Sequence, residues 1–491
     1  MLKKYPENTV FKVLAVVLLI ASSCNPDNGA KKQSPSAGNG YIEISRENPA
    51  YFCFSDGTPY IPVGINMISP GGRYKDNADS SIYDFGLWMK KLSDNGGNYL
   101  RVWLSSPFWD IEDEHAGEFR EEKARRIDSL IKMAGKYDLR IKMTLEHFRS
   151  LTAEENPQPW ATRSVYHTSE GGPLDSIRQY LTSPEGHRLF LDKVDFYSKR
   201  YGSDTLFFGW ELWNEMNAMK GPEDSIFFHW NEQMLNAVKE HFPENLVMQS
   251  LGSFDTEKVR PLYMKMMLMQ GNEVAQVHRY LDLGAAMETC HMPMDIICSS
   301  AVEELRSYNT GKPVILAETG AVEPSHSGPS KYYPVDTAGI ILHDILFAPF
   351  FSGSAGAGMS WHWDSYVDKN NLWYHFNRFS EAIRGINPIE EGFVPSRYET
   401  EDCRIYQLTG KKTILIWLRD KKNNWQSELR DGIPPEVSTI NLDLKKSGVN
   451  NSTSRIEIYD PWKNKRSVAR ETDLKVLLPG FKRSLVVRIE R

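Results

Sequence analysis

Short apolar runs alternate with amphipathic segments over residues 41–392 of this 491-residue chain. Eight of these runs have the length and the β-branched or aromatic content of buried strands. They are Tyr60–Ile65, Tyr99–Leu104, Arg140–Leu145, Leu206–Trp213, Leu246–Ser250, Val274–His278, Pro313–Ala317 and Ala357–Trp361. Helix-like segments separate them, and eight strand–helix units predict an α/β fold of the (β/α)8 TIM-barrel type.

Some helix boundaries can be read from the same pattern. The segment 81–92 places Ile82, Phe85, Trp88 and Leu92 on one face of a helix. Ser183 is expected to cap a helix that starts at Pro184, because proline suits the first helical turn. The eighth helix of the barrel is expected over residues 371–386.

Residues 393–491 show a different pattern, with alternating strands separated by turns and no helix of comparable strength. This texture predicts a small C-terminal antiparallel β-sandwich, an accessory domain that follows the barrel domain at 41–392. The expected strands include Thr413–Leu418, Arg455–Tyr459, Leu474–Leu478 and Ser484–Ile489.

The N-terminus has the features of a targeting segment. Lysines precede an apolar run at 13–20, which is too short to span a bilayer, and small residues then lead to Cys24. Small residues before a cysteine resemble the bacterial lipobox. We therefore expect a signal peptide at 1–24, a polar tether at 25–40, and a lipid on Cys24 that anchors the exported protein to a bacterial membrane, at the outer membrane or cell surface. An ordinary secretory signal with an incidental cysteine is the alternative.

Charge and cysteine content narrow the possible functions. The net charge of −6 offers no basic surface for nucleic acid. Cys290 and Cys298 form the one close cysteine pair, which is either a disulfide or two buried thiols. Histidines and cysteines do not fall at metal-ligand spacing, so neither a metal nor a cofactor is expected. The sequence leaves the oligomeric state open.

Two glutamates stand at the ends of predicted strands. Glu215 follows Leu206–Trp213 and Asn214, and Glu318 follows Pro313–Ala317. The carboxyl ends of barrel strands meet at one face, where active sites form. Hydrolysis of a glycosidic bond needs one carboxyl group to protonate the leaving oxygen and a second to attack or support the sugar carbon. A glutamate after a strand can also cap a helix or face solvent, so the neighbouring residues decide the interpretation.

Several neighbours support a catalytic interpretation. Arg101 lies inside an apolar strand, where a charge is costly unless it is paired, and Glu318 is the expected partner; a buried ion pair elsewhere in the barrel is the alternative. Asn214 is expected to bind a sugar hydroxyl. His278 and Tyr280 face the same side of the sixth strand. We expect the Tyr280 hydroxyl to contact the nucleophilic carboxylate and His278 to contact a substrate hydroxyl.

Further candidate substrate contacts end other strands. Trp361 is expected to form the floor under a sugar ring, with Trp363 or plain core packing as alternatives. His147 at the end of the third strand and Asn66 after the first are candidate polar contacts. The long loop at 156–180 is expected to overhang the barrel mouth and shape the substrate site.

Taken together, these residues resemble the retaining glycoside hydrolases of clan A, and most of all glycoside hydrolase family 5, the cellulase and mannanase family. The resemblance covers residues 41–392 and rests on Arg101, Asn214, Glu215, His278, Tyr280, Glu318 and Trp361. It implies that Glu215 is the acid/base and Glu318 the nucleophile in retaining hydrolysis of a β-linked poly- or oligosaccharide, with β-mannan favoured.

The match to the family pattern is incomplete. Met216 and Asn217 follow Glu215, where many members of the family have proline. Two other functions use the same scaffold: a non-catalytic, glycan-binding surface lipoprotein, and a transglycosylase.

Overall fold

The computed structural model describes residues 38–70, 78–154, 158–449 and 455–491. Residues 37–491 form one compact unit. The predicted signal peptide at 1–24, Cys24 and most of the predicted tether lie outside the described residues, and the boundary at residue 392 stays a prediction. Among the helices described, none is long and apolar enough to cross a membrane.

Parallel strands form the predicted barrel. Five of them are hydrogen-bonded in chain order, and two more pair with each other. The five are β4 (Gly64–Asn66), β5 (Tyr99–Trp103), β6 (Arg140–Glu146), β7 (Phe207–Trp213) and β8 (Leu246–Met248); the pair is β9 (Ala275–Asp282) and β10 (Val314–Val322). The TIM-barrel prediction is confirmed, and the carboxyl ends of these strands define the face on which to look for a site.

Two predicted strands differ from the observed ones. Tyr60–Ile65 is divided, because Pro62 lacks the N–H that a continuous ladder needs. Its first part, β3 (Pro59–Tyr60), joins β1 (Ile42–Ile44) and β2 (Phe52–Phe54) in an antiparallel sheet outside the barrel. In place of the eighth strand, Ser360 alone bridges Ile65 on one side and Thr319 on the other. The glycines that precede Ser360 weaken a strand there.

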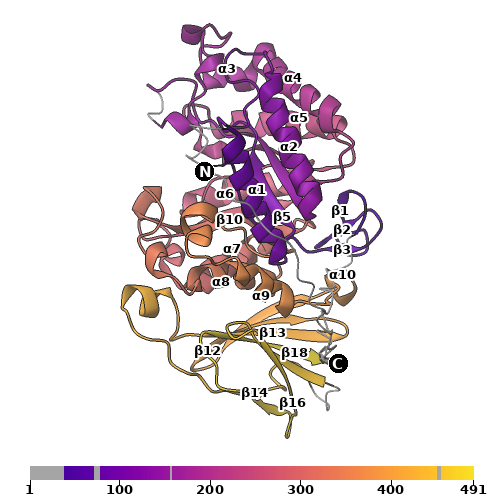
Figure 1. The fold of residues 1–491 in the computed structure, drawn as a ribbon, viewed down its shortest axis with the longest axis vertical. Helices are drawn as coiled ribbons and strands as arrows, with labels where there is room; N and C mark the ends of the chain where they lie inside the picture. The colour runs from indigo at the N-terminus through magenta and orange to yellow at the C-terminus, as the bar shows by residue number, and fades with distance from the viewer. Residues whose placement is uncertain (1–37, 71–77, 155–157, 450–454) are drawn as a thin grey trace, which may run out of the picture. The chain divides into compact units, whose positions relative to one another are not determined.

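Helices cover the barrel strands (Figure 1). The Ser183 hydroxyl accepts a hydrogen bond from the Gly186 N–H at 3.1 Å, as expected of a helix cap. The predicted eighth helix is present but shorter, as α9. The helices are α1 (Ala78–Asp94), α2 (Glu121–Tyr137), α3 (Ile177–Thr182), α4 (Pro184–Tyr201), α5 (Asp224–His241), α6 (Arg260–Leu268), α7 (Met294–Ser307), α8 (Ile340–Phe351), α9 (Tyr374–Ala382) and α10 (Pro388–Glu391).

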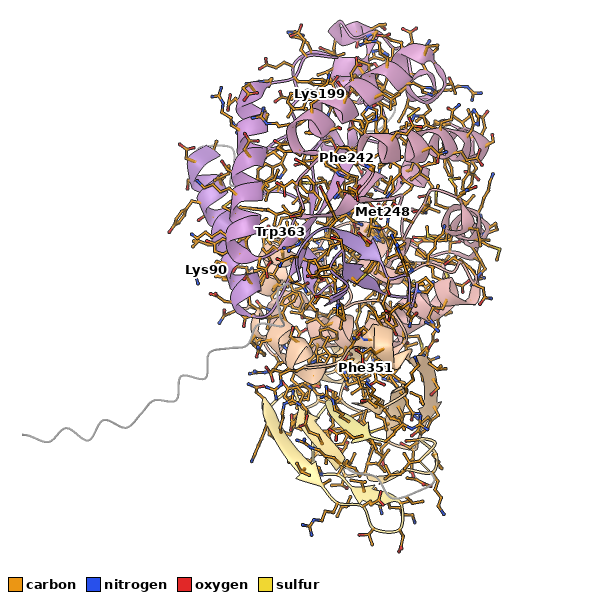
Figure 2. The ribbon with its side chains drawn as sticks, turned by 90° about the vertical axis from the view of Figure 1, so that its right-hand side faces the viewer. Lys90, Lys199, Phe242, Met248, Phe351 and Trp363 are labelled. Carbon is orange, nitrogen blue, oxygen red and sulfur yellow. The ribbon has the colours of Figure 1, made fainter. Side chains whose placement is uncertain are left out.

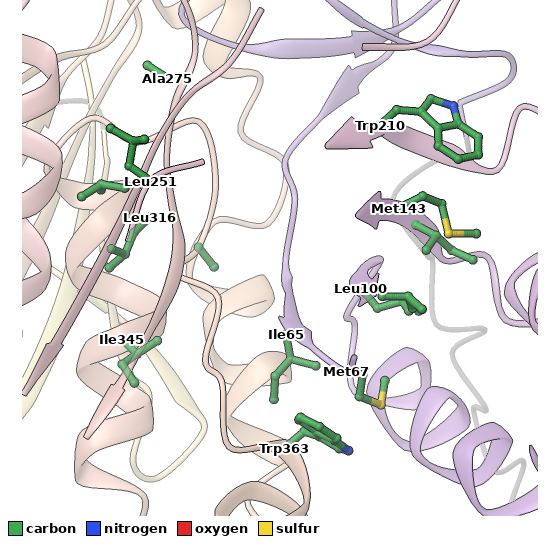
Figure 3. Packing of buried hydrophobic residues seen from close by; sticks show 14 of the residues in the cluster. Ile65, Met67, Leu100, Met143, Trp210, Leu251, Ala275, Leu316, Ile345 and Trp363 are labelled. Atoms are coloured by element: carbon green, nitrogen blue, oxygen red, sulfur yellow. The ribbon is translucent and has the colours of Figure 1, made fainter. Parts of the chain in front are cut away.

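The largest apolar core lies between the strands and these helices. Leu100, Met143, Trp210 and Leu316, from four different strands, are all buried in it (Figure 3). Successive residues of a strand point to opposite faces, so the residues next to them point into the barrel. Three of those neighbours are charged, namely Arg101, Lys142 and Glu211. The barrel interior therefore contains ionic groups enclosed by an apolar layer.

The C-terminal part is an antiparallel sheet covered by a two-stranded ribbon, as the predicted β-sandwich fold requires. Apolar residues of the sheet, such as Ile416, pack with Leu442 and Val476 of the ribbon. The sheet order is β11 (Val394–Glu399), β12 (Cys403–Thr409), β13 (Thr413–Asp420), β18 (Ser484–Glu490), β15 (Arg455–Asp460) and β16 (Lys465–Ala469); the ribbon is β14 (Asn441–Asp443) with β17 (Lys475–Leu477).

Helix α8 joins the two parts of the core. Every residue of this helix is buried, which matches its almost entirely apolar sequence. Asp344 of α8 forms an ion pair with Arg419 of β13, with Oδ1 and Nε 2.7 Å apart. Phe351, labelled in Figure 2, ends α8. Its ring packs against that of Trp417 of β13. The barrel and the C-terminal sheet thus share buried contacts through α8, and Asp295 of α7 adds a buried ion pair with Arg404 of β12.

The cysteines at positions 53, 290, 298 and 403 are buried free thiols. Of the two alternatives for Cys290 and Cys298, the structure therefore shows two buried thiols and not a disulfide. Burial raises the pKa of Cys290 to about 11, so this thiol stays protonated and unreactive near neutral pH.

Candidate active site

The two glutamates predicted from the sequence meet at the carboxyl ends of the barrel strands. Glu215 follows β7 directly, and Glu318 lies within β10. One oxygen of each carboxyl group and a ring nitrogen of His278 all lie within 4.8 Å of one another. The backbone of Glu215 has a φ of 52°, in the left-handed region that residues other than glycine seldom adopt. Such conformations gather at functional sites, where the surrounding structure holds them.

Glu318 receives a hydrogen bond at each carboxylate oxygen. Arg101 donates from Nη1 to Oε2 at 2.6 Å, and the Tyr280 hydroxyl donates to Oε1 at 2.7 Å. Both contacts agree with the sequence-based expectation. They fix the carboxylate from β5 and β9, so its orientation depends on three strands.

Arg101 has further partners that surround its guanidinium group. Its Nη2 donates to the Asn214 oxygen at 2.7 Å and its Nε to Glu211 Oε2 at 2.8 Å. Thr144 accepts from Nε at 3.2 Å, and Asn66 accepts from Nη1 at 3.3 Å. The Arg101 side chain is wholly buried. A cation in this position is tolerable only because carboxylates and amide oxygens surround it.

Glu211 is the buried acid that sequence analysis missed. It points into the barrel from β7 and contacts both Arg101 and Lys142, the latter at 3.2 Å. Burial by itself would raise the pKa of Glu211, but the charges of Arg101 and Lys142 hold that pKa well below its usual range. Burial lowers the pKa of Lys142 to about 8, although Glu211 opposes the shift. Glu211 is therefore the permanent counter-charge beneath the site.

Glu215 is bound from two directions. His278 Nδ1 lies 3.0 Å from Oε1, and Arg149 donates from Nη2 to Oε2 at 2.7 Å. Burial raises the pKa of Glu215, but the hydrogen bond with His278 and the charge of Arg149 together lower it to about 2. In this state Glu215 is a carboxylate at neutral pH.

The other residues predicted on neighbouring strands lie at the site and make contacts within the protein. His278 is wholly buried and contacts Glu215 through Nδ1, and its contact with a substrate hydroxyl stays a prediction. Asn66 is also wholly buried, and its amide donates to the carbonyl oxygens of Ala317 and Met359 at 3.1 and 3.0 Å. It therefore helps to close the barrel. Substrate contact by Asn214 stays a prediction, because its oxygen is held by Arg101.

Aromatic rings line one side of the site. Trp361 is partly exposed and its ring lies 5.0 Å from that of Trp103, whereas Trp363 is buried. Trp160, in the loop after β6, is 45% exposed and stacks on His147 with an interplanar angle of 4°. Trp361, and not Trp363, is thus accessible to a sugar.

His147 already uses both ring nitrogens within the protein. The Trp160 carbonyl accepts from Nε2 at 2.6 Å, so Nδ1 accepts from the Ser105 hydroxyl at 2.7 Å. Burial lowers the pKa of His147 to about 4, and the ring is neutral near pH 7. Its predicted substrate contact stays a prediction, and the observed contacts place the loop that carries Trp160.

Among the described residues, Glu215, His278 and Glu318 are the group whose spacing would allow a metal ion. Arg149 and Arg101 already place a positive charge on each of the two carboxylates. A metal cation would have to bind against both guanidinium groups, which disfavours it. The donor set fits acid–base chemistry better than a metal centre.

The comparison with known families identifies the class of protein. The model of the cellulase family, glycosyl hydrolase family 5, matches residues 87–338, just over half of the chain. The chain belongs to glycosyl hydrolase family 5 and is a glycoside hydrolase. No curated protein matches it in sequence.

Solved structures show the same fold at low sequence identity. A glycoside hydrolase family 5 protein from Bacteroides vulgatus ATCC 8482 is 14% identical, with a TM-score of 0.56 over 92% of this chain and 93% of the other. A putative glycoside hydrolase from the same organism is 14% identical, with a TM-score of 0.54 over 93% and 83%. An exo-β-1,4-mannosidase from Opitutaceae bacterium strain TAV5 is 17% identical, with a TM-score of 0.50 over 69% and 62%.

The residues missed at the sequence level carried a signal of their own. Lys142 and Glu211 are charges inside apolar strands, the same feature that singled out Arg101. Arg101 and Lys142 are two cations inside apolar strands and need two buried carboxylates as partners. Glu318 is one, and the position of Glu211 inside an apolar strand would have indicated it as the other. Arg149 carried no comparable signal, because it follows its strand among other polar residues.

We expect Glu211→Gln to lower the free energy of unfolding by about 3–5 kcal/mol, because two buried cations lose a counter-charge while the shape of the side chain is kept. Urea denaturation of the variant beside Glu240→Gln, which changes an exposed glutamate of α5, measures the effect. The control should unfold like the wild type. Equal midpoints for all three proteins would show that Arg101 and Lys142 do not depend on Glu211.

Proposed function

We propose that this glycoside hydrolase cleaves β-glycosidic bonds of a poly- or oligosaccharide with retention, using Glu215 as acid/base and Glu318 as nucleophile. The observation that carries the proposal is the spacing of the two carboxyl groups, whose nearest oxygens lie within 4.8 Å. Retaining enzymes have carboxyl groups about 5–5.5 Å apart, whereas inverting enzymes need about 6.5–9.5 Å to admit a water molecule. The observed spacing favours direct attack on the sugar.

The contacts of Glu318 suit a nucleophile. Arg101 and Tyr280 each hold one oxygen. The bond between a Glu318 oxygen and the anomeric carbon forms as the glycosidic C–O bond breaks. Glu215 gives its proton to the departing oxygen. In the second half of the reaction Glu215 takes a proton from water, the water oxygen bonds to the same carbon, and Glu318 leaves as a carboxylate.

Asn214 and Trp361 are the groups we propose for binding the reacting sugar. Arg101 holds the Asn214 oxygen, so the amide nitrogen is the atom available to donate to a sugar hydroxyl. A contact to the hydroxyl next to the reacting carbon strengthens in the transition state and lowers the barrier. The exposed part of Trp361 provides an apolar face for the ring.

For the substrate, β-mannan is the polysaccharide we propose to test first. One of the similar structures is an exo-β-1,4-mannosidase, which supports this choice. Incubation with a panel of β-mannans, β-glucans and β-xylans, followed by chromatography of the products, identifies the glycan. The same experiment separates attack within chains from release at chain ends. Longer products than the starting oligosaccharide would indicate transglycosylation.

The acid role of Glu215 predicts a dependence on the leaving group. Glu215→Ala should lose at least about 100-fold in kcat on a natural glycan, because its leaving alkoxide needs a proton. The first step on a dinitrophenyl glycoside should be spared, since that leaving group departs as a stable anion. Pre-steady-state kinetics on both substrates measures the two effects. An equal loss on both would contradict an acid role.

The nucleophile role of Glu318 predicts a covalent intermediate. A slow 2-fluoro glycoside with a good leaving group should leave its sugar on the peptide that contains Glu318, as detected by mass spectrometry. The first product of normal turnover should keep the β configuration, as followed by proton NMR. Glu318→Gln should form no adduct. A sugar on another residue, or an α product, would exclude this mechanism.

We also propose that the protein is exported and held on a bacterial membrane by a lipid on Cys24. The support is the sequence at 13–24, where a short apolar run and small residues lead to the cysteine. Cys24→Ser should move the protein from the membrane fraction to the soluble fraction. Cys53→Ser, which changes a buried thiol, is the matched control and should leave fractionation unchanged. Membrane association of Cys24→Ser after a salt wash would contradict the proposal.

A further inference from the structure

The guanidinium group of Arg149 lies beside Glu215, the proposed acid/base. It has no role in the catalytic mechanism proposed above. Arg149 follows β6 and donates from Nη2 to Glu215 Oε2 at 2.7 Å. Its guanidinium group lies over the ring of Trp160, 4.8 Å from the centroid. The Arg149 side chain is 20% exposed, and its Nε is buried without a hydrogen-bond partner. The group is thus partly desolvated and incompletely bonded.

The three cations that contact the catalytic glutamates or Glu211 face three carboxylates only while Glu215 is ionised. Arg101 and Lys142 are paired with Glu211 and Glu318. Within the described residues, the ion pair of Arg149 is with Glu215 alone. To act as an acid, Glu215 has to carry a proton and therefore lose its charge. Protonation of Glu215 therefore leaves the partly buried guanidinium group of Arg149 without a counter-charge.

We propose that Arg149 binds an anionic group, a carboxylate or a sulfate ester, on the substrate sugar next to Glu215. This inference rests on the proposed function, because the imbalance arises only if Glu215 is the acid. The planar guanidinium group suits such an anion, since it can donate two parallel hydrogen bonds to a pair of oxygens. Trp160, 45% exposed beside Arg149, offers an apolar face for the same sugar ring.

Binding of the anion also removes one of the interactions that keep Glu215 ionised. In the unliganded protein, His278 and Arg149 hold the pKa of Glu215 at about 2, against the effect of burial. An anion on Arg149 competes for the guanidinium group and cancels its charge. The loss of this charge raises the pKa of Glu215 and so favours the protonated form, which can donate to the glycosidic oxygen. A neutral sugar, such as a unit of β-mannan, provides no such exchange, so among glycans with the same linkage we expect those with an acidic group beside the cleaved bond to be cleaved faster.

A binding experiment tests the anion site without requiring turnover. Isothermal titration calorimetry compares the methyl β-glycosides of glucuronate and mannuronate with those of glucose and mannose. The 6-sulfates of the two neutral glycosides form a third arm, which separates recognition of a carboxylate from recognition of a sulfate. We expect the wild type to bind at least one anionic glycoside about 10-fold or more tightly than its neutral counterpart, as is typical of charge-assisted hydrogen bonds.

The variants assign this preference to Arg149. Arg149→Gln should bind the acidic and neutral glycosides within about twofold of each other, because the charged donor is gone. Arg149→Lys keeps the charge without the planar fork and should keep only part of the preference. The control is Arg125→Gln, which removes one charge from an exposed residue of α2 and should bind like the wild type. The melting temperature of each variant reports whether it is folded.

Each result of the binding experiment either supports or overturns the proposal. Equal binding of acidic and neutral glycosides by the wild type, or no binding of either, overturns it. A preference that persists in Arg149→Gln overturns it as well. Failure of the proposed function is seen separately, as a sugar adduct on a residue other than Glu318, and it does not alter the binding ratios.

Discussion

The buried guanidinium group of Arg101 is the interaction on which the barrel and its site both depend. It extends from β5 and bonds to residues of β4, β6, β7 and β10 or directly after them. A cation without solvent contact is stable only when charge and hydrogen-bond partners surround it. The partners must therefore stand at fixed positions, and this requirement orders the strand ends that carry the catalytic candidates.

The same buried residues stabilise the barrel and form the proposed catalytic site. Glu318 compensates Arg101 and is also the proposed nucleophile, while Glu211 supplies the charge that remains during the reaction. The apolar layer between strands and helices excludes water from these groups, which strengthens their electrostatic interactions. Such an arrangement is prepared before substrate binds, and preorganised charge of this kind lowers barriers more than groups that must reorient.

The C-terminal sheet adds to this core without reaching the site. Helix α8 is buried on all sides because β10, α7 and α9 of the barrel pack against it on one side and β12 and β13 of the sheet on another. Its ion pair with Arg419 is enclosed in the same way as the one around Arg101. An exposed α8 would present an apolar surface to water, so the sheet is structurally required by the sequence of this helix.

The sequence alone determined the barrel, the C-terminal sheet and the positions of Glu215 and Glu318. Each follows from the periodicity of a strand and from the rule that barrel strands end at one face. The tertiary structure decided which side chains meet there. Glu211 beneath Arg101, Arg149 on Glu215 and Ser360 as the closing bridge depend on strand register and loop path. Periodicity reports the burial of each strand separately, whereas these contacts form through space between segments far apart in the chain.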